Sequence, residues 1–183
     1  MLQLSRTWLR KAGTAVAQRA GTSKGTSMVP AVAYATPIHP LSSEVSTTLT
    51  VSAGVAYEIF SDALEIPRWL PIVQAARTLA RYPDGRPERV AFTRKLERGS
   101  LGYTLEYRYD PAHLTVAWTT PEASNVVLTG EARFVALSNR ACLMLYRLVL
   151  DLPVVDDLLR SELDHHPASH VVAEFREHLR RLC

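Results

Sequence analysis

Hydrophobic and polar residues alternate over most of the chain between residues 44 and 150, a pattern typical of β-strands with one buried face. The first segment, 44–51, is rich in Val and Thr. Short turn sequences, including Asp84-Gly85, join the later segments into three hairpins. The paired segments are 75–81 with 88–96, 101–109 with 114–119, and 125–137 with 141–150. Seven strands with short connections predict an antiparallel sheet.

Two regions interrupt this alternation with helical spacing. Ser52 stands where a helix N-cap belongs, and residues 56–63 continue as a short helix. Pro67 and Pro71 prevent a long helix after it, so we expect a tight helical corner at one end of the sheet.

The second helical region follows Pro153 and extends to the C-terminus. Apolar residues recur at helical spacing over 155–163, Pro167 starts a new helix, and an apolar stripe runs from Val172 to Leu182. Arg180 and Arg181 fall in the last turn, where cations suit the helix dipole. The order of elements predicts an α+β protein whose sheet packs against a long C-terminal helix.

Composition separates residues 1–43 from the rest of the chain. Five basic residues and no acidic residue occur in this segment, whereas 44–183 holds the other 16 basic residues and all 18 acidic ones, a formal charge of −2. We interpret 1–43 as a basic leader that is disordered or targeting-like, or as an upstream start before Met28. Residues 44–183 form the predicted domain. We expect a cytoplasmic protein, or a mitochondrial one if the leader is a transit peptide.

Several function classes are excluded or disfavoured. Residues 44–183 have no basic block for nucleic acid, and no apolar run approaches the roughly 18 residues that span a bilayer. Transient membrane contact and oligomeric state stay open. His166 and His170 are four residues apart, but Pro167 lies between them and no third ligand accompanies them. We therefore expect no metal site and no cofactor.

Several sequence features occur together in one order: the alternating first strand, Ser52-Ala53 leading into YEIFSD (57–62), then PRWLP (67–71), YTLEYRYD (103–110) and VAW (116–118). In these features the chain resembles the START-related SRPBCC superfamily, which includes polyketide cyclase/dehydrase, lipid-transport and coenzyme Q-binding members. The resemblance covers everything after the leader and departs at 153–167. It implies a helix-grip fold: a curved antiparallel sheet of about seven strands around a long C-terminal helix, with two short helices after strand 1.

Such a sheet leaves an apolar cavity between itself and the helix. Glu106 and Arg108 should face away from it, and Trp69 is expected to wedge the helical corner against the sheet. For any one residue predicted to line this cavity, the alternative interpretation is that its side chain only fills the hydrophobic core and contacts no ligand. The side chains that alternation directs toward the cavity are Phe92, Arg94, Tyr103, Leu105, Tyr107, Tyr109, Val116, Trp118, Met144 and Tyr146, joined by Val172 and Phe175 from the helix.

We expect a noncatalytic protein that binds or carries a hydrophobic small molecule, such as a quinone, isoprenoid lipid or polyketide. The alternative is a polyketide aromatase/cyclase acting in the same cavity, which would need a titratable group with a perturbed pKa facing inward. A third hypothesis is an interaction module with a solid interior. Catalytic residues are not identified by the sequence.

Overall fold

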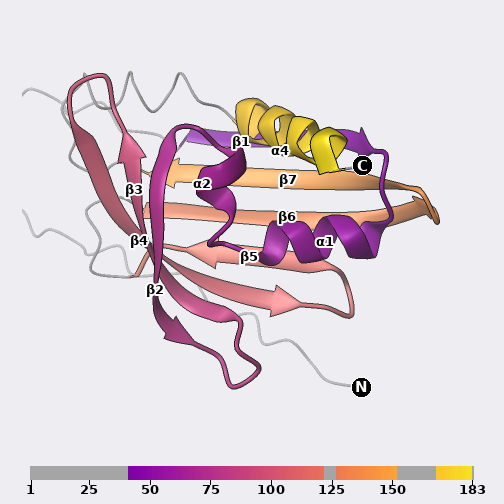
Figure 1. Ribbon diagram of the computed structural model, residues 1–183, viewed down its shortest axis with the longest axis horizontal. Helices are drawn as coiled ribbons and strands as arrows, with labels where there is room; N and C mark the ends of the chain where they lie inside the picture. Colours follow the sequence, from indigo (N-terminus) through magenta and orange to yellow (C-terminus); the bar gives the residue numbers. More distant parts are fainter. Residues whose placement is uncertain (1–40, 122–126, 152–167, 183) are drawn as a thin grey trace, which may run out of the picture. The chain divides into compact units, whose positions relative to one another are not determined.

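Seven strands form one antiparallel sheet in the order β1-β7-β6-β5-β4-β3-β2 (Figure 1). The computed structural model describes residues 41–121, 127–151 and 168–182, all within the unit Pro37–Cys183. In these ranges no helix is long and apolar enough to cross a membrane. The strands are β1 (Leu41–Leu49), β2 (Val73–Arg81), β3 (Pro87–Lys95), β4 (Ser100–Asp110), β5 (Thr115–Thr119), β6 (Val127–Ser138) and β7 (Ala141–Asp151).

The predicted fold class and its strands are confirmed, with small changes at the strand ends. β1 begins at Leu41 and ends at Leu49, so Val51 lies beyond the strand although its side chain is buried. The first hairpin turns at Gly85, whose φ of 90° favours glycine, and the Gly85 amide donates to the Tyr82 carbonyl. Antiparallel pairing follows because each strand from β3 to β7 returns beside the one before it.

The connection from β1 to β2 crosses from one edge of the sheet to the other through two helices, α1 (Ala53–Ser61) and α2 (Ile66–Trp69). The Ser52 side chain accepts a hydrogen bond from the Val55 amide, as expected of an N-cap. The predicted cap is therefore confirmed, and the helix ends at Ser61, two residues before the expected end at Ala63. Pro67 occupies the first turn of α2, where its missing amide costs no hydrogen bond.

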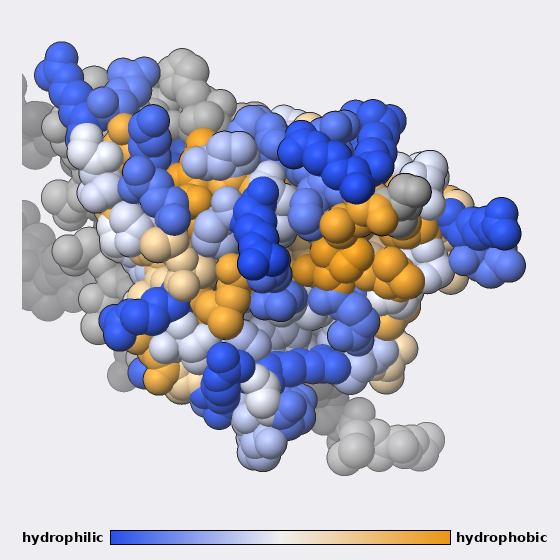
Figure 2. Space-filling view, in the orientation of Figure 1, coloured by the Kyte–Doolittle hydropathy of each residue, from blue (hydrophilic) through white to orange (hydrophobic). Residues whose placement is uncertain are grey.

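All three described helices lie on the same face of the sheet (Figure 1). The third, α4 (Ala168–Leu182), buries Ala168, Val172, Phe175 and Leu179, which recur every three or four residues and form one stripe. The predicted helical segment 155–163 and residues 1–40 of the expected leader lie outside the described residues, whereas residues 41–43 of that leader belong to β1. Figure 2 shows apolar surface over the region of α1 and the end of α4, with charged side chains around it. Val55 of α1 and Leu182 of α4 are among the exposed large hydrophobic residues.

Phe60 of α1 stands at the centre of the core between helices and sheet. Its ring centroid lies 5.1 Å from that of Phe175 and 5.7 Å from that of Phe134, both edge-on or tilted. Trp69 and Trp118 lie 6.0 and 5.9 Å away. Pairs in these geometries add about 0.5–1.5 kcal/mol each beyond their buried area. This aromatic cluster closes one part of the interior and so limits where a cavity can remain.

Candidate functional site: an apolar cavity beneath the helices

A cavity of about 100 Å³ lies between the inner face of the sheet and the helices α1, α2 and α4. Its buried wall is largely aromatic, and its half-buried residues surround the open side. The described lining residues are Phe60, Ile66, Trp69, Leu70, Ile72, Val73, Phe92, Arg94, Tyr103, Leu105, Tyr107, Trp118, Leu128, Tyr146, Leu148 and Val171.

Strand alternation directs most of the predicted lining residues into this cavity. Those that line it are Phe92, Arg94, Tyr103, Leu105, Tyr107, Trp118 and Tyr146. They come from four strands, and the pairing of Phe92 with Tyr103 and of Tyr107 with Trp118 sets them side by side. The structure thus assembles a continuous wall from residues far apart in the sequence.

The other predicted residues lie in the packed interior and do not line the cavity. Val116, Met144 and Phe175 are fully buried, and Val172 is nearly so. Val171, one residue earlier on α4, lines the cavity in its place. The reason is that alternation determines which face a side chain takes, whereas packing around Phe60 determines how much of that face stays open.

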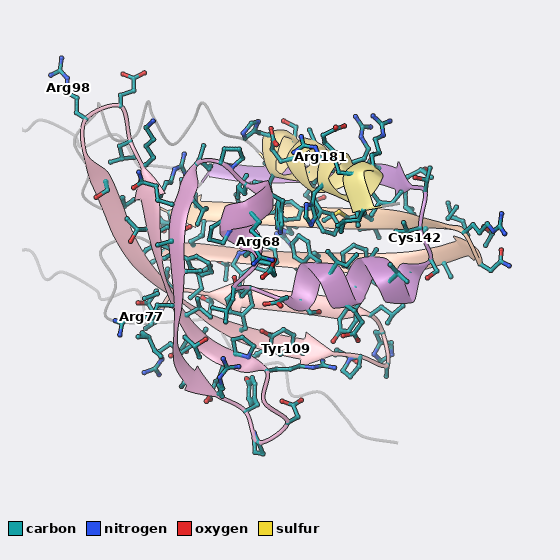
Figure 3. All side chains as sticks on the ribbon, in the orientation of Figure 1. Arg68, Arg77, Arg98, Tyr109, Cys142 and Arg181 are labelled. Atoms are coloured by element: carbon teal, nitrogen blue, oxygen red, sulfur yellow. The ribbon has the colours of Figure 1, made fainter. Side chains whose placement is uncertain are left out.

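Tyr109 also lies away from the cavity, near the far end of β4. Its hydroxyl donates a hydrogen bond to the Pro87 carbonyl at 2.8 Å, so its polar end is already satisfied. Figure 3 shows Tyr109 well apart from Arg68, which precedes Trp69 on α2. We therefore assign Tyr109 to the support of the hairpin.

Sequence reasoning missed the contribution of the helical corner. Trp69 was expected to act as a wedge; its ring does pack against Phe60 and Phe175, at centroid distances of 6.0 and 5.3 Å, but it also lines the cavity. The residues that were not anticipated are Phe60, Ile66, Trp69, Leu70, Ile72, Val73, Leu128, Leu148 and Val171. The PRWLP motif was the available signal, because two prolines around a tryptophan place a large ring at a sharp corner.

Trp118 is held close to β6 by a glycine. Gly130 pairs with Trp118 across β5 and β6, and a Cβ atom at position 130 would overlap the indole ring. The ring in turn lies 5.5 Å from Tyr146, measured between centroids. Gly130 therefore lets Trp118 lie flat against the sheet and leaves space above it.

The tyrosine hydroxyls of the cavity are poor acids. Burial raises the pKa of Tyr103 to about 12, although the Arg94 guanidinium works in the opposite direction. Burial likewise raises the pKa values of Tyr107 and Tyr146 well above the usual 10. These groups stay protonated near neutral pH and can donate hydrogen bonds. Among the described lining residues there is no carboxylate, imidazole or thiol.

A larger concavity, of about 480 Å³, lies on the opposite face of the sheet. Glu106 and Arg108 line it, as expected from their outward direction, together with Glu131 and Arg147. This surface is open and carries both charges, so it does not enclose an apolar molecule. The mostly apolar cavity under the helices, which is open on one side, is the better candidate for ligand binding.

No group of three or more metal-ligating side chains occurs in residues 41–121, 127–151 and 168–182. His170 lies on α4, whereas His166 lies outside the described residues. The structure therefore gives no geometry for this pair.

The structure is similar to several solved structures, whereas the sequence matches no family model and no curated protein. A START superfamily protein from Mycobacterium smegmatis has 20% identity and a TM-score of 0.66, over 78% of this chain and 99% of that one. The Zhui aromatase/cyclase from Streptomyces sp. R1128 has 17% identity and a TM-score of 0.65, over 79% and 97%. A protein from Thermus thermophilus has 14% identity and a TM-score of 0.64, over 78% and 99%. The described part of the chain has the START-like helix-grip fold.

Proposed function

We propose that the protein binds or carries a hydrophobic small molecule, such as a quinone, an isoprenoid lipid or a polyketide, in the cavity between sheet and helices. The observation that carries this proposal is the enclosed, mostly apolar lining, which extends from α2 across β3, β4 and β5 to β7. Removing apolar ligand surface from water drives such binding, at roughly 25 cal/mol per Å² before association costs.

The size of the cavity bears on what binds there. Ligand pockets commonly measure about 300–1,000 Å³, whereas this cavity measures about 100 Å³. The enclosed space therefore fits one ring or a short branched chain. Ile72, Leu128, Leu148 and Val171 are only half buried, so the remainder of a longer molecule would extend along these side chains.

Binding without catalysis is favoured by the chemistry of the lining. A cyclase needs an inward group that exchanges protons near the working pH. Burial moves the pKa values of Tyr103, Tyr107 and Tyr146 away from neutrality, so these hydroxyls orient a ligand but do not supply an acid or base.

Native mass spectrometry of the protein purified from its own host, followed by organic extraction, tests the proposal. We expect a bound quinone, lipid or polyketide. A second arm uses the fluorescent probe N-phenyl-1-naphthylamine with the variant Leu148→Trp, which fills the cavity, and with Val149→Trp, the next residue on the outer face. The first variant should weaken probe binding at least tenfold and the second should not. Absence of both a co-purified molecule and probe binding would refute the proposal.

Polyketide aromatase/cyclase activity is the second candidate. Arg94 and Tyr103 line one wall of the cavity, and the guanidinium acts on the pKa of the tyrosine hydroxyl. A cation beside a hydroxyl can polarise a ketone. Turnover of a poly-β-keto substrate that is lost in Tyr107→Phe or Tyr103→Phe, with ligand affinity retained, would favour the enzyme over the carrier.

A further inference from the structure

The indole N–H of Trp69 is a buried donor that has no partner among the described residues. Trp69 is only 3% exposed, and its indole Nε1 has no hydrogen-bond acceptor in the part of the chain that the structure describes. The indole N–H is a donor and cannot act as an acceptor. Leaving such a group buried without an acceptor costs about 1–3 kcal/mol, so its retention needs an explanation.

The described residues around Trp69 do not satisfy this donor. One side of the indole packs on the rings of Phe60 and Phe175. The neighbouring lining side chains from the same corner, Ile66, Leu70 and Ile72, are aliphatic. Trp69 itself lines the cavity, so a molecule bound there would pack against its indole.

The other polar side chains that line the cavity are also mainly hydrogen-bond donors. Arg94 carries only donors, and the tyrosine hydroxyls of Tyr103, Tyr107 and Tyr146 remain protonated. A bound cation or a molecule rich in N–H groups would find few acceptors among the described lining side chains. An uncharged molecule with an exposed oxygen would find several donors.

We propose, resting on the function proposed above, that the Trp69 indole N–H donates a hydrogen bond to a carbonyl or ether oxygen of the bound molecule, and that it selects oxygen-bearing apolar ligands over hydrocarbons of the same shape. Trp69 is thus a specificity-determining residue of the cavity. Quinones and polyketides carry such oxygens, and a plain hydrocarbon chain does not.

Two probes of one shape test this inference: acetophenone, which has a carbonyl, and ethylbenzene, which does not. Each fits a cavity for a single ring. Trp69→Phe keeps an aromatic ring against Phe60 and Phe175 but removes the N–H. We expect this variant to bind acetophenone about fivefold more weakly, the size of one net hydrogen bond, and to bind ethylbenzene with little change.

Trp118→Phe is the matched control, because it also shortens an indole that lines the cavity while the Trp69 N–H stays in place. Both probes should then change in affinity together. A nitrogen-15 spectrum of the wild-type protein adds a direct readout. The Trp69 indole signal, identified by its loss in Trp69→Phe, should move downfield with acetophenone and stay in place with ethylbenzene.

The outcomes separate this inference from the proposed function. If both probes bind but their affinity ratio is the same in wild type and Trp69→Phe, with the indole signal unmoved, the inference is wrong and the binding function stands. If neither probe binds the wild type and nothing co-purifies, the binding function itself fails. If Trp69→Phe does not fold, the Trp69 signal is identified by elimination with Trp8→Phe and Trp118→Phe, and its shift in the wild type with the two probes decides alone.

Discussion

Gly130 shows at the scale of a single residue how the cavity wall is built. A strand glycine normally weakens a sheet, and here it is required because the Trp118 ring occupies the space of a Cβ atom. Replacing Gly130 by a larger residue displaces the Trp118 indole from its place in the wall. The effect is local and does not depend on which ligand binds.

Gly130→Ala should therefore lower the free energy of unfolding by about 1–3 kcal/mol, the usual cost of overpacking. Urea denaturation measures it. Gly102→Ala in β4 is the control, because the nearest atom to an added Cβ there, the Phe92 carbonyl oxygen, is 4.0 Å away. Equal destabilisation by the two substitutions would contradict this assignment.

Burial of the tyrosines has a consequence for alkaline pH. The pKa values of Tyr103, Tyr107, Tyr109 and Tyr146 are raised, mainly by desolvation, whereas an unfolded tyrosine ionises near 10. Between pH 10 and the folded pKa values, the folded state holds more protons than the unfolded state. Stability is thus unaffected below pH 10 and falls as the pH rises through about 12, the pKa of Tyr103.

Absorbance at 295 nm follows this titration. We expect a group of tyrosines to ionise late in the folded protein and near pH 10 in urea, and the late group to lose amplitude in Tyr103→Phe. Ionisation of all tyrosines together near pH 10, with the native circular dichroism retained, would show that these rings are not buried as described.

At the scale of the elements, one arginine joins the first helix to the β2–β3 turn. Arg86 donates a hydrogen bond to the Tyr57 hydroxyl at 2.8 Å. Its guanidinium carbon lies 5.7 Å from the Tyr57 ring centre and 5.4 Å from that of Tyr109. The planar group is therefore held between an α1 ring and a β4 ring, a geometry that arginine provides and lysine reproduces poorly.

Arg86→Ala should lower the free energy of unfolding by about 1–2 kcal/mol, from one hydrogen bond and two cation–π contacts. Arg86→Lys should recover less than half of this loss. Arg98→Ala is the control; Arg98 projects from the tip of the β3–β4 hairpin (Figure 3), and removing it should change stability by less than about 0.5 kcal/mol. Full recovery by lysine would show that charge alone matters.

At the scale of the whole molecule, Phe60 links the helices to the sheet. Its ring contacts rings from α2, β5, β6, β7 and α4, and its side chain also lines the cavity. The residue that fills the core therefore also sets one boundary of the ligand space. Stability and cavity volume should change together when this ring is shortened.

Phe60→Ala should lower the free energy of unfolding by about 3–5 kcal/mol, measured by urea denaturation, and should enlarge the cavity. If it folds, it should bind larger uncharged probes than the wild type. Val55→Ala, on the same helix but 46% exposed, should cost less than about 1 kcal/mol. A small effect of Phe60→Ala would mean that the ring cluster is not the centre of the core.

The sequence by itself determined the elements and the direction of their side chains. Tyr103 and Tyr107 face inward while Glu106 and Arg108 face outward, and the strand pattern predicted this because alternation is a local property of the backbone. Antiparallel pairing followed from the short turns. An antiparallel sheet with a long C-terminal helix could therefore be predicted before any contact was known, and the resemblance to START-related proteins implied the helix-grip fold.

Only the tertiary structure decided which inward side chains meet open space. Met144 and Tyr146 alternate identically on β7, yet Met144 is packed in the core and Tyr146 lines the cavity. The packing of α2 against α4 and the sheet places Trp69 at the cavity. The same packing leaves its indole N–H without an acceptor among the described residues. Cavities are set by how side chains from distant segments fill the interior, which no local pattern encodes.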